Sequence, residues 1–161
     1  MTMNEVLEEI SSVTSIEKKR ISAPDALNEA FHYARPSSFS RGLRLEFGNV
    51  VVLLISGTAS VGANGETVHV GDFRAQARRM FQNVTALLNA EGATWHDVVR
   101  TTCYLRDIDR DYVVFNEERT AFYKEQALDP LPASTGIQAK LCRPDLLVEM
   151  EAIAIFTSAK E

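Results

Sequence analysis

Hydrophobic and polar residues recur with two different periods along this chain, and the changes of period mark its elements. At 39–47, leucine and phenylalanine alternate with glycine and charged residues, which is typical of a strand with one polar face. Gly48-Asn49 follows, and then the apolar run 50–55, so the two runs predict a hairpin. Related patterns predict strands at 98–105, 133–141 and within 145–154, and a short first strand at 18–22.

Apolar residues at helical spacing predict two helices. The first begins at Asp72 and stops at Gly92, and its inward residues are Ala77, Met80, Phe81, Val84, Leu87 and Leu88. The second covers 112–123 and ends before two prolines; its inward residues are Phe115, Phe122 and either Val114 or Ala121. A weaker pattern, formed by Val6, Leu7 and Ile10, predicts a short helix near the N-terminus.

The order of these elements, β-β-α-β-α-β-β after the short first strand, predicts an α+β domain with a layer of helices on a sheet. Two helices can cover only one face of that sheet. The other face carries apolar residues such as Val99 and Ile153, so we expect self-association. We expect one domain at 31–161, preceded by a partly ordered extension at 1–30.

Composition narrows the classes of function. The 161 residues fit one domain, and the net charge of −5 offers no basic footprint for nucleic acid. Cys103 and Cys142 form no disulfide framework, and no stretch has the length of a membrane span or the form of a signal peptide, so we expect a cytoplasmic protein. The histidines lack metal-ligand spacing, so no metal is expected. Cys103 fits a buried structural thiol better than a nucleophile.

The last predicted strand carries two carboxylates on an otherwise apolar face. Glu149 and Glu151 alternate there with Leu147 and Ile153, because side chains one residue apart point to opposite faces. A buried carboxylate requires a partner, a ligand or water. The alternative is that this face lies at the rim of the sheet, where both side chains are hydrated or paired with cations.

Other candidate site residues lie at the ends of predicted elements. Ser56-Gly57-Thr58 closes one strand, Asn116 lies on the second helix, and Ser134-Thr135-Gly136 begins the strand before the glutamates. Such turns can offer backbone N–H groups to a carboxylate or an oxyanion. Each residue alone is better explained as a turn or cap residue, and it is their combination with Glu149 that favours a site.

Several of these segments, in this order, resemble the Rid family of reactive-intermediate deaminases, also called YjgF-like proteins. The resemblance covers about 39–156. It is carried by Ile55-Ser56-Gly57, Gln76-Ala77-Arg78 with Asn83-Val84, Val98-Val99-Arg100-Thr101-Thr102-Cys103-Tyr104-Leu105, Phe115-Asn116-Glu117, Pro132-Ala133 and Val148-Glu149-Met150-Glu151-Ala152.

The resemblance implies a fold like that of the small chorismate mutases and a homotrimer with ligand clefts between subunits. It implies hydrolysis of enamines and imines, such as 2-aminoacrylate and 2-iminopropanoate, to a 2-keto acid and ammonia without a metal or organic cofactor. By motif position, Glu149 matches the water-positioning glutamate and Asn116 the helix asparagine. Ser56 and Gly57 match residues lining the cleft, and Gly136 stands where many members use a cysteine N–H.

The chain departs from the family at the carboxylate-binding position. Ser134 stands where the signature has an arginine, and Phe39 where typical members have a tyrosine. Arg41 or Arg44 on the neighbouring strand could supply the missing charge. The alternatives are a trimer that binds a metabolite without turnover, a ribonuclease or translation inhibitor, and a chorismatase-like lyase, for which the chain is short.

Overall fold

The computed structural model describes residues 2–5 and 15–158 of the chain. The helix predicted from Val6, Leu7 and Ile10 lies outside the described residues. The strands are β1 (Ile16–Arg20), β2 (Gly42–Phe47), β3 (Val50–Ala59), β4 (Val98–Leu105), β5 (Ala133–Gln138) and β6 (Val148–Thr157). The helices are α2 (Phe73–Ala90) and α3 (Ile108–Glu125), with single 3₁₀ turns η1 (Ala30–His32) and η2 (Trp95–Asp97).

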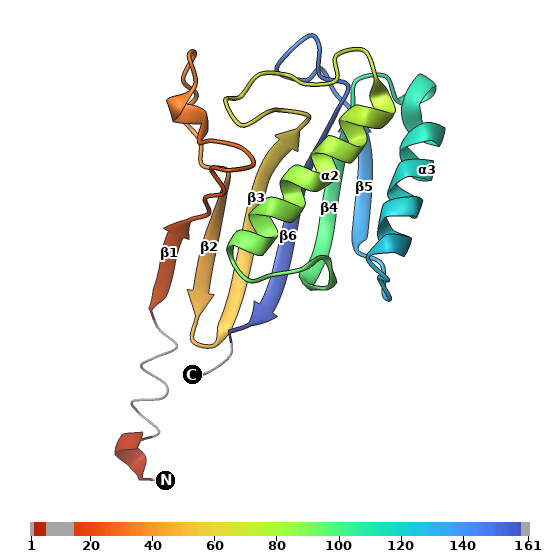
Figure 1. Cartoon of the computed structure of the whole chain (residues 1–161). Coiled ribbons are helices and arrows are strands. Elements are labelled where there is room, and N and C mark those ends of the chain that lie inside the picture. The colour runs from red at the N-terminus through yellow and green to blue at the C-terminus, as the bar shows by residue number, and fades with distance from the viewer. Residues whose placement is uncertain (1, 6–14, 159–161) are drawn as a thin grey trace.

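The strands form one six-stranded sheet in the order β1-β2-β3-β6-β4-β5. Neighbours pair antiparallel except β4 and β5, which run parallel. Helices α2 and α3 lie on the same face of this sheet (Figure 1). The predicted α+β domain, with two helices on one face of a mixed sheet, is therefore confirmed.

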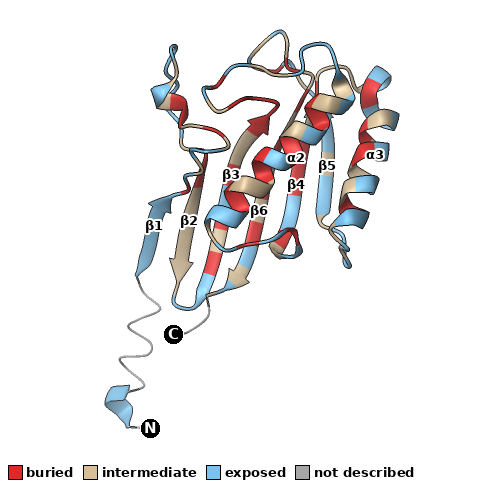
Figure 2. Cartoon of the chain, viewed as in Figure 1, coloured by how far each residue is buried: buried red, intermediate tan, exposed pale blue. Residues whose placement is uncertain are grey.

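The hydrophobic core lies between the sheet and the two helices. Burial alternates along the central strands and follows one stripe of each helix (Figure 2). Phe81 of α2 stacks on Phe122 of α3, with ring centroids 4.4 Å apart, and Trp95 and Tyr123 surround this pair. The aromatic cluster thus fixes α3 against α2.

Two buried amides of α2 organise the loops around one end of the sheet. Gln76 Nε2 donates to Asp145 O at 2.8 Å, and its Oε1 accepts from Leu147 N at 2.8 Å. Asn83 Nδ2 donates to the carbonyls of Ala59 and Val61 at 2.9 and 3.0 Å. Both amides are fully used inside the protein, because a buried polar group without a partner is costly. These internal hydrogen bonds explain why Gln76 and Asn83 occupy their places in the motif.

Several predicted boundaries were wrong. β1 covers Ile16–Arg20 rather than 18–22, and β5 ends at Gln138 rather than at 141. α3 begins at Ile108 instead of 112, because the Asp107 side chain caps the helix by accepting from Arg110 N. β6 begins only at Val148 because 143–146 form a turn, in which Leu146 N donates to Arg143 O.

The second sheet face carries exposed apolar side chains. We call this the open face; its exposed members are Val50, Leu54, Val99, Ile137 and Ile155. A bulge between Val98 and Arg100 separates Val99 from Thr101 and Cys103, with which simple alternation would group it.

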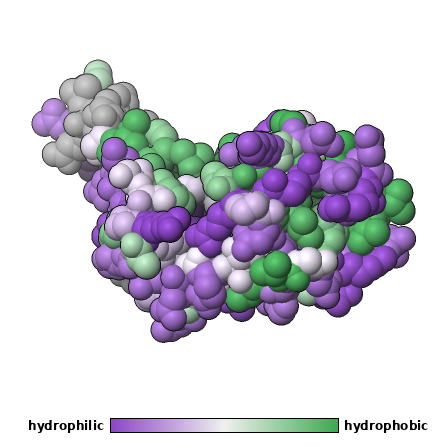
Figure 3. All heavy atoms as spheres, turned by 90° about the horizontal axis from the view of Figure 1, so that it is seen from above, coloured by the Kyte–Doolittle hydropathy of each residue, from purple (hydrophilic) through white to green (hydrophobic). Residues whose placement is uncertain are grey.

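The surface seen from above is mostly hydrophilic, with hydrophobic patches between the hydrophilic side chains (Figure 3). No helix among the described residues is both long and apolar enough to cross a membrane.

Candidate functional site

Glu149 lies in a small cavity at the end of the sheet where β3 and β6 pair. The cavity has a volume of about 130 Å³. It is lined by Tyr33, Ser37, Phe39, Arg41, Gly57, Ala59, Val61, Cys142, Arg143, Leu146 and Glu149, and we call it the Glu149 cavity. A space of this size suits a small ligand together with water.

The backbone of β3 makes room for the Glu149 carboxylate. The pairing of β3 with β6 shifts register between Ile55 and Thr58, and Gly57 lies in this bulge. A Cβ atom at position 57 would come within 2.0 Å of Glu149 Oε1. Glycine at this position therefore leaves room for the carboxylate, which a larger side chain would displace.

Burial of Glu149 changes its acidity. Removal from solvent raises the pKa of this carboxyl, Glu151 raises it further, and Arg41 opposes the rise. A carboxylate with a raised pKa is a stronger base than an ordinary glutamate. This greater basicity suits it to accept a proton from water.

Arg41 brings a buried cation into the Glu149 cavity. The residue is only 4% exposed, and its Nε donates to Asn28 O at 3.1 Å. Its guanidinium carbon lies 5.0 Å from the ring centre of Tyr33 and 5.3 Å from that of Phe39. Its Nη2 is buried and has no hydrogen-bond partner among the described residues.

Neighbouring groups hold Arg41 in this position. Ser56 N donates to Arg41 O at 3.1 Å, so the end of β3 fixes the backbone. Burial lowers the pKa of Arg41, the Glu29 carboxylate opposes this effect, and Arg143 adds to it. The guanidinium nevertheless stays protonated in proteins. A buried cation with an unused donor, facing a carboxylate, is an arrangement that can bind a small anion.

Arg143 supplies a second cation to the same cavity. It lies 5.9 Å from the ring centre of Tyr33, which places the tyrosine ring between two guanidinium groups. Its Nη1 donates to Gly65 O and, at 3.3 Å, to Thr67 Oγ1. Arg44 does not belong to this group, because it pairs with Glu46 and Glu91.

The predicted site residues fall into two groups in the chain. Phe39, Arg41, Gly57 and Glu149 line the Glu149 cavity. Ser56 contributes through its backbone, while its hydroxyl donates to Ser40 O at 2.7 Å.

The remaining predicted residues lie on α3 and β5. Ser134 and Asn116 are joined by Arg119, whose Nη1 donates to Ser134 Oγ at 3.1 Å and whose Nη2 donates to Asn116 Oδ1. Thr135 accepts a hydrogen bond from Arg100 Nη2 at 3.0 Å, and Gly136 packs beside Tyr112.

The position that replaces the signature arginine faces the helices. Ser134 Oγ accepts from Thr101 Oγ1 at 3.0 Å in addition to Arg119, and it lies 4.0 Å from Cys103 Sγ. Burial raises the pKa of the Cys103 thiol, so Cys103 is not an activated nucleophile. Both cysteines are free.

Three site residues were missed at the level of sequence: Tyr33, Arg119 and Arg143. Arg119 follows Asn116 by three positions, a spacing that places both on one face of a helix, so this signal was available. Tyr33 and Arg143 lie in loops, and alternation gives no indication of where such residues point. Among the described residues, no group of three or more His, Cys, Asp and Glu side chains could hold a metal ion.

Comparisons with known proteins agree with this architecture. The family model described as endoribonuclease L-PSP matches residues 34–156. The chain is 30% identical over 112 residues to the 2-iminobutanoate/2-iminopropanoate deaminase of Escherichia coli K12, covering 69% of this chain and 83% of the relative. It is 30% identical over 103 residues to the 3-aminoacrylate deaminase RutC of Acinetobacter baylyi, covering 64% and 78%.

A solved structure gives the same result. The crystal structure of the YjgF gene product from E. coli superposes with a TM-score of 0.67 at 29% identity, covering 85% of this chain and 98% of the other. Fold, motif order and a family match over most of the chain therefore agree: the protein belongs to the endoribonuclease L-PSP family, the Rid or YjgF-like family that its motifs indicate.

Proposed function

We propose that the protein hydrolyses small imines or enamines that carry a carboxylate, with Glu149 positioning the water and Arg41 binding the carboxylate. One observation carries the proposal: a buried guanidinium with an unused donor shares a cavity of about 130 Å³ with a glutamate whose pKa is raised. The names of the two deaminase relatives support the same class of substrate.

The chemistry needs only these groups and water. Glu149 takes a proton from water while the water oxygen bonds to the imine carbon. The proton then passes to the nitrogen, which gives an amino alcohol. The hydroxyl proton follows to the nitrogen by way of Glu149, the carbon–nitrogen bond breaks, and ammonia leaves as the carbonyl forms. The products are a 2-keto acid and ammonia. An enamine enters the same path once its carbon has taken a proton to give the imine.

Arg41 replaces the signature arginine in this proposal. Arg41 lines the Glu149 cavity itself, whereas position 134 holds a serine that is already hydrogen-bonded to Thr101 and Arg119. Arg44, the other candidate cation from the sequence, is held by Glu46 and Glu91. A charge-assisted hydrogen bond to the substrate would contribute about 1.5–3 kcal/mol, or about tenfold to more than a hundredfold in affinity.

We further propose that the working form is a homotrimer in which the open faces meet and the clefts lie between subunits. The exposed apolar residues of the open face, Leu54 and Ile155 among them, support this assembly, since a soluble protein rarely leaves such a patch uncovered. A cytoplasmic location fits the free thiols Cys103 and Cys142.

The test is release of ammonia and pyruvate from 2-iminopropanoate generated in place by an amino-acid oxidase acting on alanine. We expect the wild type to accelerate release, Glu149→Gln to lower kcat by at least a hundredfold, and Arg41→Gln chiefly to raise KM, by tenfold or more. Arg44→Gln, a change at a paired arginine of β2 three residues further on, serves as the control.

Other results would support other functions for the protein or another role for Arg41. If Arg41→Gln behaves like the control, Arg41 does not bind the carboxylate. If the wild type is inactive but Ser134→Arg gains turnover, the natural chain is a binder of metabolites whose water site is intact. Ribonuclease activity is the lesser alternative, and the net charge of −5 weighs against strong RNA binding.

A further inference from the structure

Cys142 is a free thiol at the wall of the Glu149 cavity. It is exposed, and it lines the cavity together with Arg41, Arg143 and Glu149. The proposed hydrolysis gives this thiol no role. An accessible thiol reacts with the electrophiles that reach it, so the groups beside Cys142 decide which electrophiles are held there long enough to react.

The chain on both sides of Cys142 is fixed by Arg106. The guanidinium of Arg106 donates through Nε to Leu146 O at 2.6 Å, and through Nη2 to Leu141 O at 3.4 Å and to Arg143 O. These hydrogen bonds hold the residues immediately before and after the cysteine. The thiol is therefore kept beside the cavity by a well-anchored loop.

Two guanidinium groups of the cavity have unused donors. Arg41 is 4% exposed, and its Nη2 is buried without a hydrogen-bond partner among the described residues. Arg143 uses its Nη1 for Gly65 O and Thr67 Oγ1, which leaves its other donors available. Within the described part of the chain, Glu149 is the one acidic residue that lines the cavity. A small anion that enters would therefore meet two cations and one carboxylate.

We propose that Cys142 is a covalent modification site for small carboxylates that carry an electrophilic carbon, which Arg41 and Arg143 hold beside the thiol. The inference rests on the proposed function in one respect, the binding of a carboxylate by Arg41. In the reaction the thiol loses its proton to solvent, the sulfur bonds to the electrophilic carbon, and the leaving group departs with its bonding electron pair. The adduct occupies a cavity of about 130 Å³ and excludes a substrate of similar size.

The test compares two reagents of nearly equal size on the full chain, iodoacetate and iodoacetamide. In both, the thiolate displaces iodide from the same kind of carbon, and iodoacetate alone carries a charge. The thiolate of glutathione favours the neutral reagent, because two anions repel each other. We expect the ratio of the iodoacetate rate to the iodoacetamide rate at Cys142 to exceed that of glutathione by about tenfold or more. Mass spectrometry of peptides gives both rates.

Substitution of the arginines locates the source of this preference. Arg41→Gln and Arg143→Gln should each slow iodoacetate severalfold and leave the iodoacetamide rate unchanged, because only the charged reagent uses the guanidinium groups. A substitution that merely loosened the fold would alter both rates. Arg44→Gln, at an arginine paired with Glu46 and Glu91, is the matched control and should keep the wild-type ratio.

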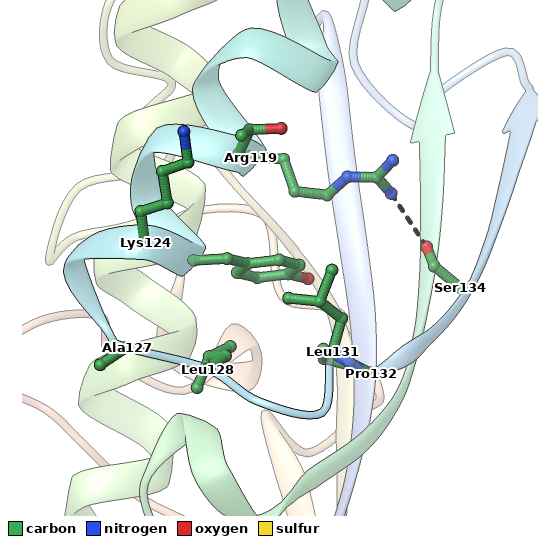
Figure 4. A pocket seen from close by; sticks show the side chains of 9 residues that line it. Arg119, Lys124, Ala127, Leu128, Leu131, Pro132 and Ser134 are labelled. Carbon is green, nitrogen blue, oxygen red and sulfur yellow. Dashed lines mark hydrogen bonds between the residues drawn. The ribbon is translucent and has the colours of Figure 1, made fainter.

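The second free thiol, Cys103, is an internal control. It is fully buried, and its sulfur lies 4.0 Å from Ser134 Oγ, the atom to which Arg119 Nη1 donates (Figure 4). Neither reagent should label Cys103 in the folded protein. Cys142→Ser should take up no label, and iodoacetate should no longer reduce its turnover.

The inference is overturned if Cys142 shows the same rate ratio as glutathione, if both arginine variants keep the wild-type iodoacetate rate, or if the label falls on Cys103 instead. Labelling and hydrolysis can fail separately. Glu149→Gln should lose turnover and keep the charge preference at Cys142. A wild type without turnover that still favours iodoacetate refutes the proposed function alone. A wild type that hydrolyses imines without this preference refutes the modification site alone.

Discussion

At the scale of single residues, the site depends on the lack of a side chain at Gly57 and on the charge of Arg41. Gly57 leaves the space that the Glu149 carboxylate occupies. Arg41 supplies the charge that opposes the cost of burying that carboxylate. Glu149 could be predicted from strand alternation and motif position. The spacing of Arg119 from Asn116 was visible in the sequence, but its hydrogen bond to Ser134 was not, because that contact depends on the rotamer of a long side chain that reaches from α3 to β5.

Gly57→Ala should remove most activity while leaving the fold intact. The new methyl group would come within 2.0 Å of Glu149 Oε1, so the carboxylate must rotate away from the bulge. We expect kcat to fall by tenfold or more, and the melting temperature to change by only a few degrees, because the clash is with the end of a flexible side chain. Activity equal to that of the wild type would contradict this account of the bulge.

Glu149→Gln should stabilise the protein at neutral pH. Because the folded-state pKa of Glu149 is raised, the folded protein binds more protons than the unfolded chain between the two pKa values, and its stability falls as pH rises through that window. We expect a gain in unfolding free energy of under about 1 kcal/mol, since the carboxylate keeps some contact with solvent.

Urea unfolding of both proteins at pH 7 and near pH 4 checks this sign. The difference should shrink toward the lower pH, where the carboxyl is protonated in both states. A variant less stable than the wild type at pH 7 would show that the carboxylate is favourably paired rather than penalised by burial.

At the scale of elements, alternation and helical spacing were sufficient for the central strands and both helices, because each of these buries one face or stripe. The edge strands β1 and β5 have no buried residue, so burial does not explain their positions. Boundaries were harder, since Asp107 and the turn at 143–146 end and begin elements through local hydrogen bonds. The position of α3 on α2 depends on contacts distant in sequence. Arg74 and Arg78 of α2 both bond to Glu118 of α3, at 2.7 and 2.8 Å.

Glu118→Gln should loosen α3 from α2. Burial alone would raise the pKa of Glu118, but the hydrogen bonds from Arg78 and Arg74 outweigh it and lower the pKa. The pairing therefore contributes stability above the unfolded-state pKa, and this is lost as pH falls through the folded-state value. We expect a loss of about 1 kcal/mol at pH 7, limited because both arginines face solvent.

Glu117→Gln is the matched control for this change. Glu117 is exposed and pairs only with Arg74 among the described residues, so its loss should cost no more than about 0.5 kcal/mol. Equal effects of the two substitutions in urea unfolding at pH 7 would show that the buried carboxylate has no special role.

At the scale of the whole molecule, the sequence predicted the open face from the number of helices alone. Two helices cover one side, and the exposed residues Val50, Leu54 and Ile155 lie on the other. What could not be predicted from the sequence is the separation of the predicted site residues into a group that lines the Glu149 cavity and a group on α3 and β5. That separation follows from the sheet order, in which β6 stands between β3 and β4 and leaves β5 at the edge.

Leu54→Glu should dissociate the expected trimer, because it puts a charge at the centre of the open face. Light scattering after size exclusion should give about three times the 17.9 kDa chain for the wild type and a single chain for the variant. Val70→Glu, at an exposed apolar residue in the loop before α2, should leave the mass unchanged. A wild-type mass of one chain would refute the trimer.

The edge position of β5 has a consequence for its local dynamics. β5 pairs with one neighbour only, through a parallel ladder, and five of its six residues are exposed. Strands held in this way open locally at a lower free energy than central ones, so their amides exchange with solvent sooner. Ser134 lies on this strand and accepts a hydrogen bond from Arg119, so one contact from α3 holds the edge strand. We expect the amides of β5 to take up deuterium sooner than those of the central strands β3 and β6, and this uptake measures how firmly the edge is held without any assay of turnover.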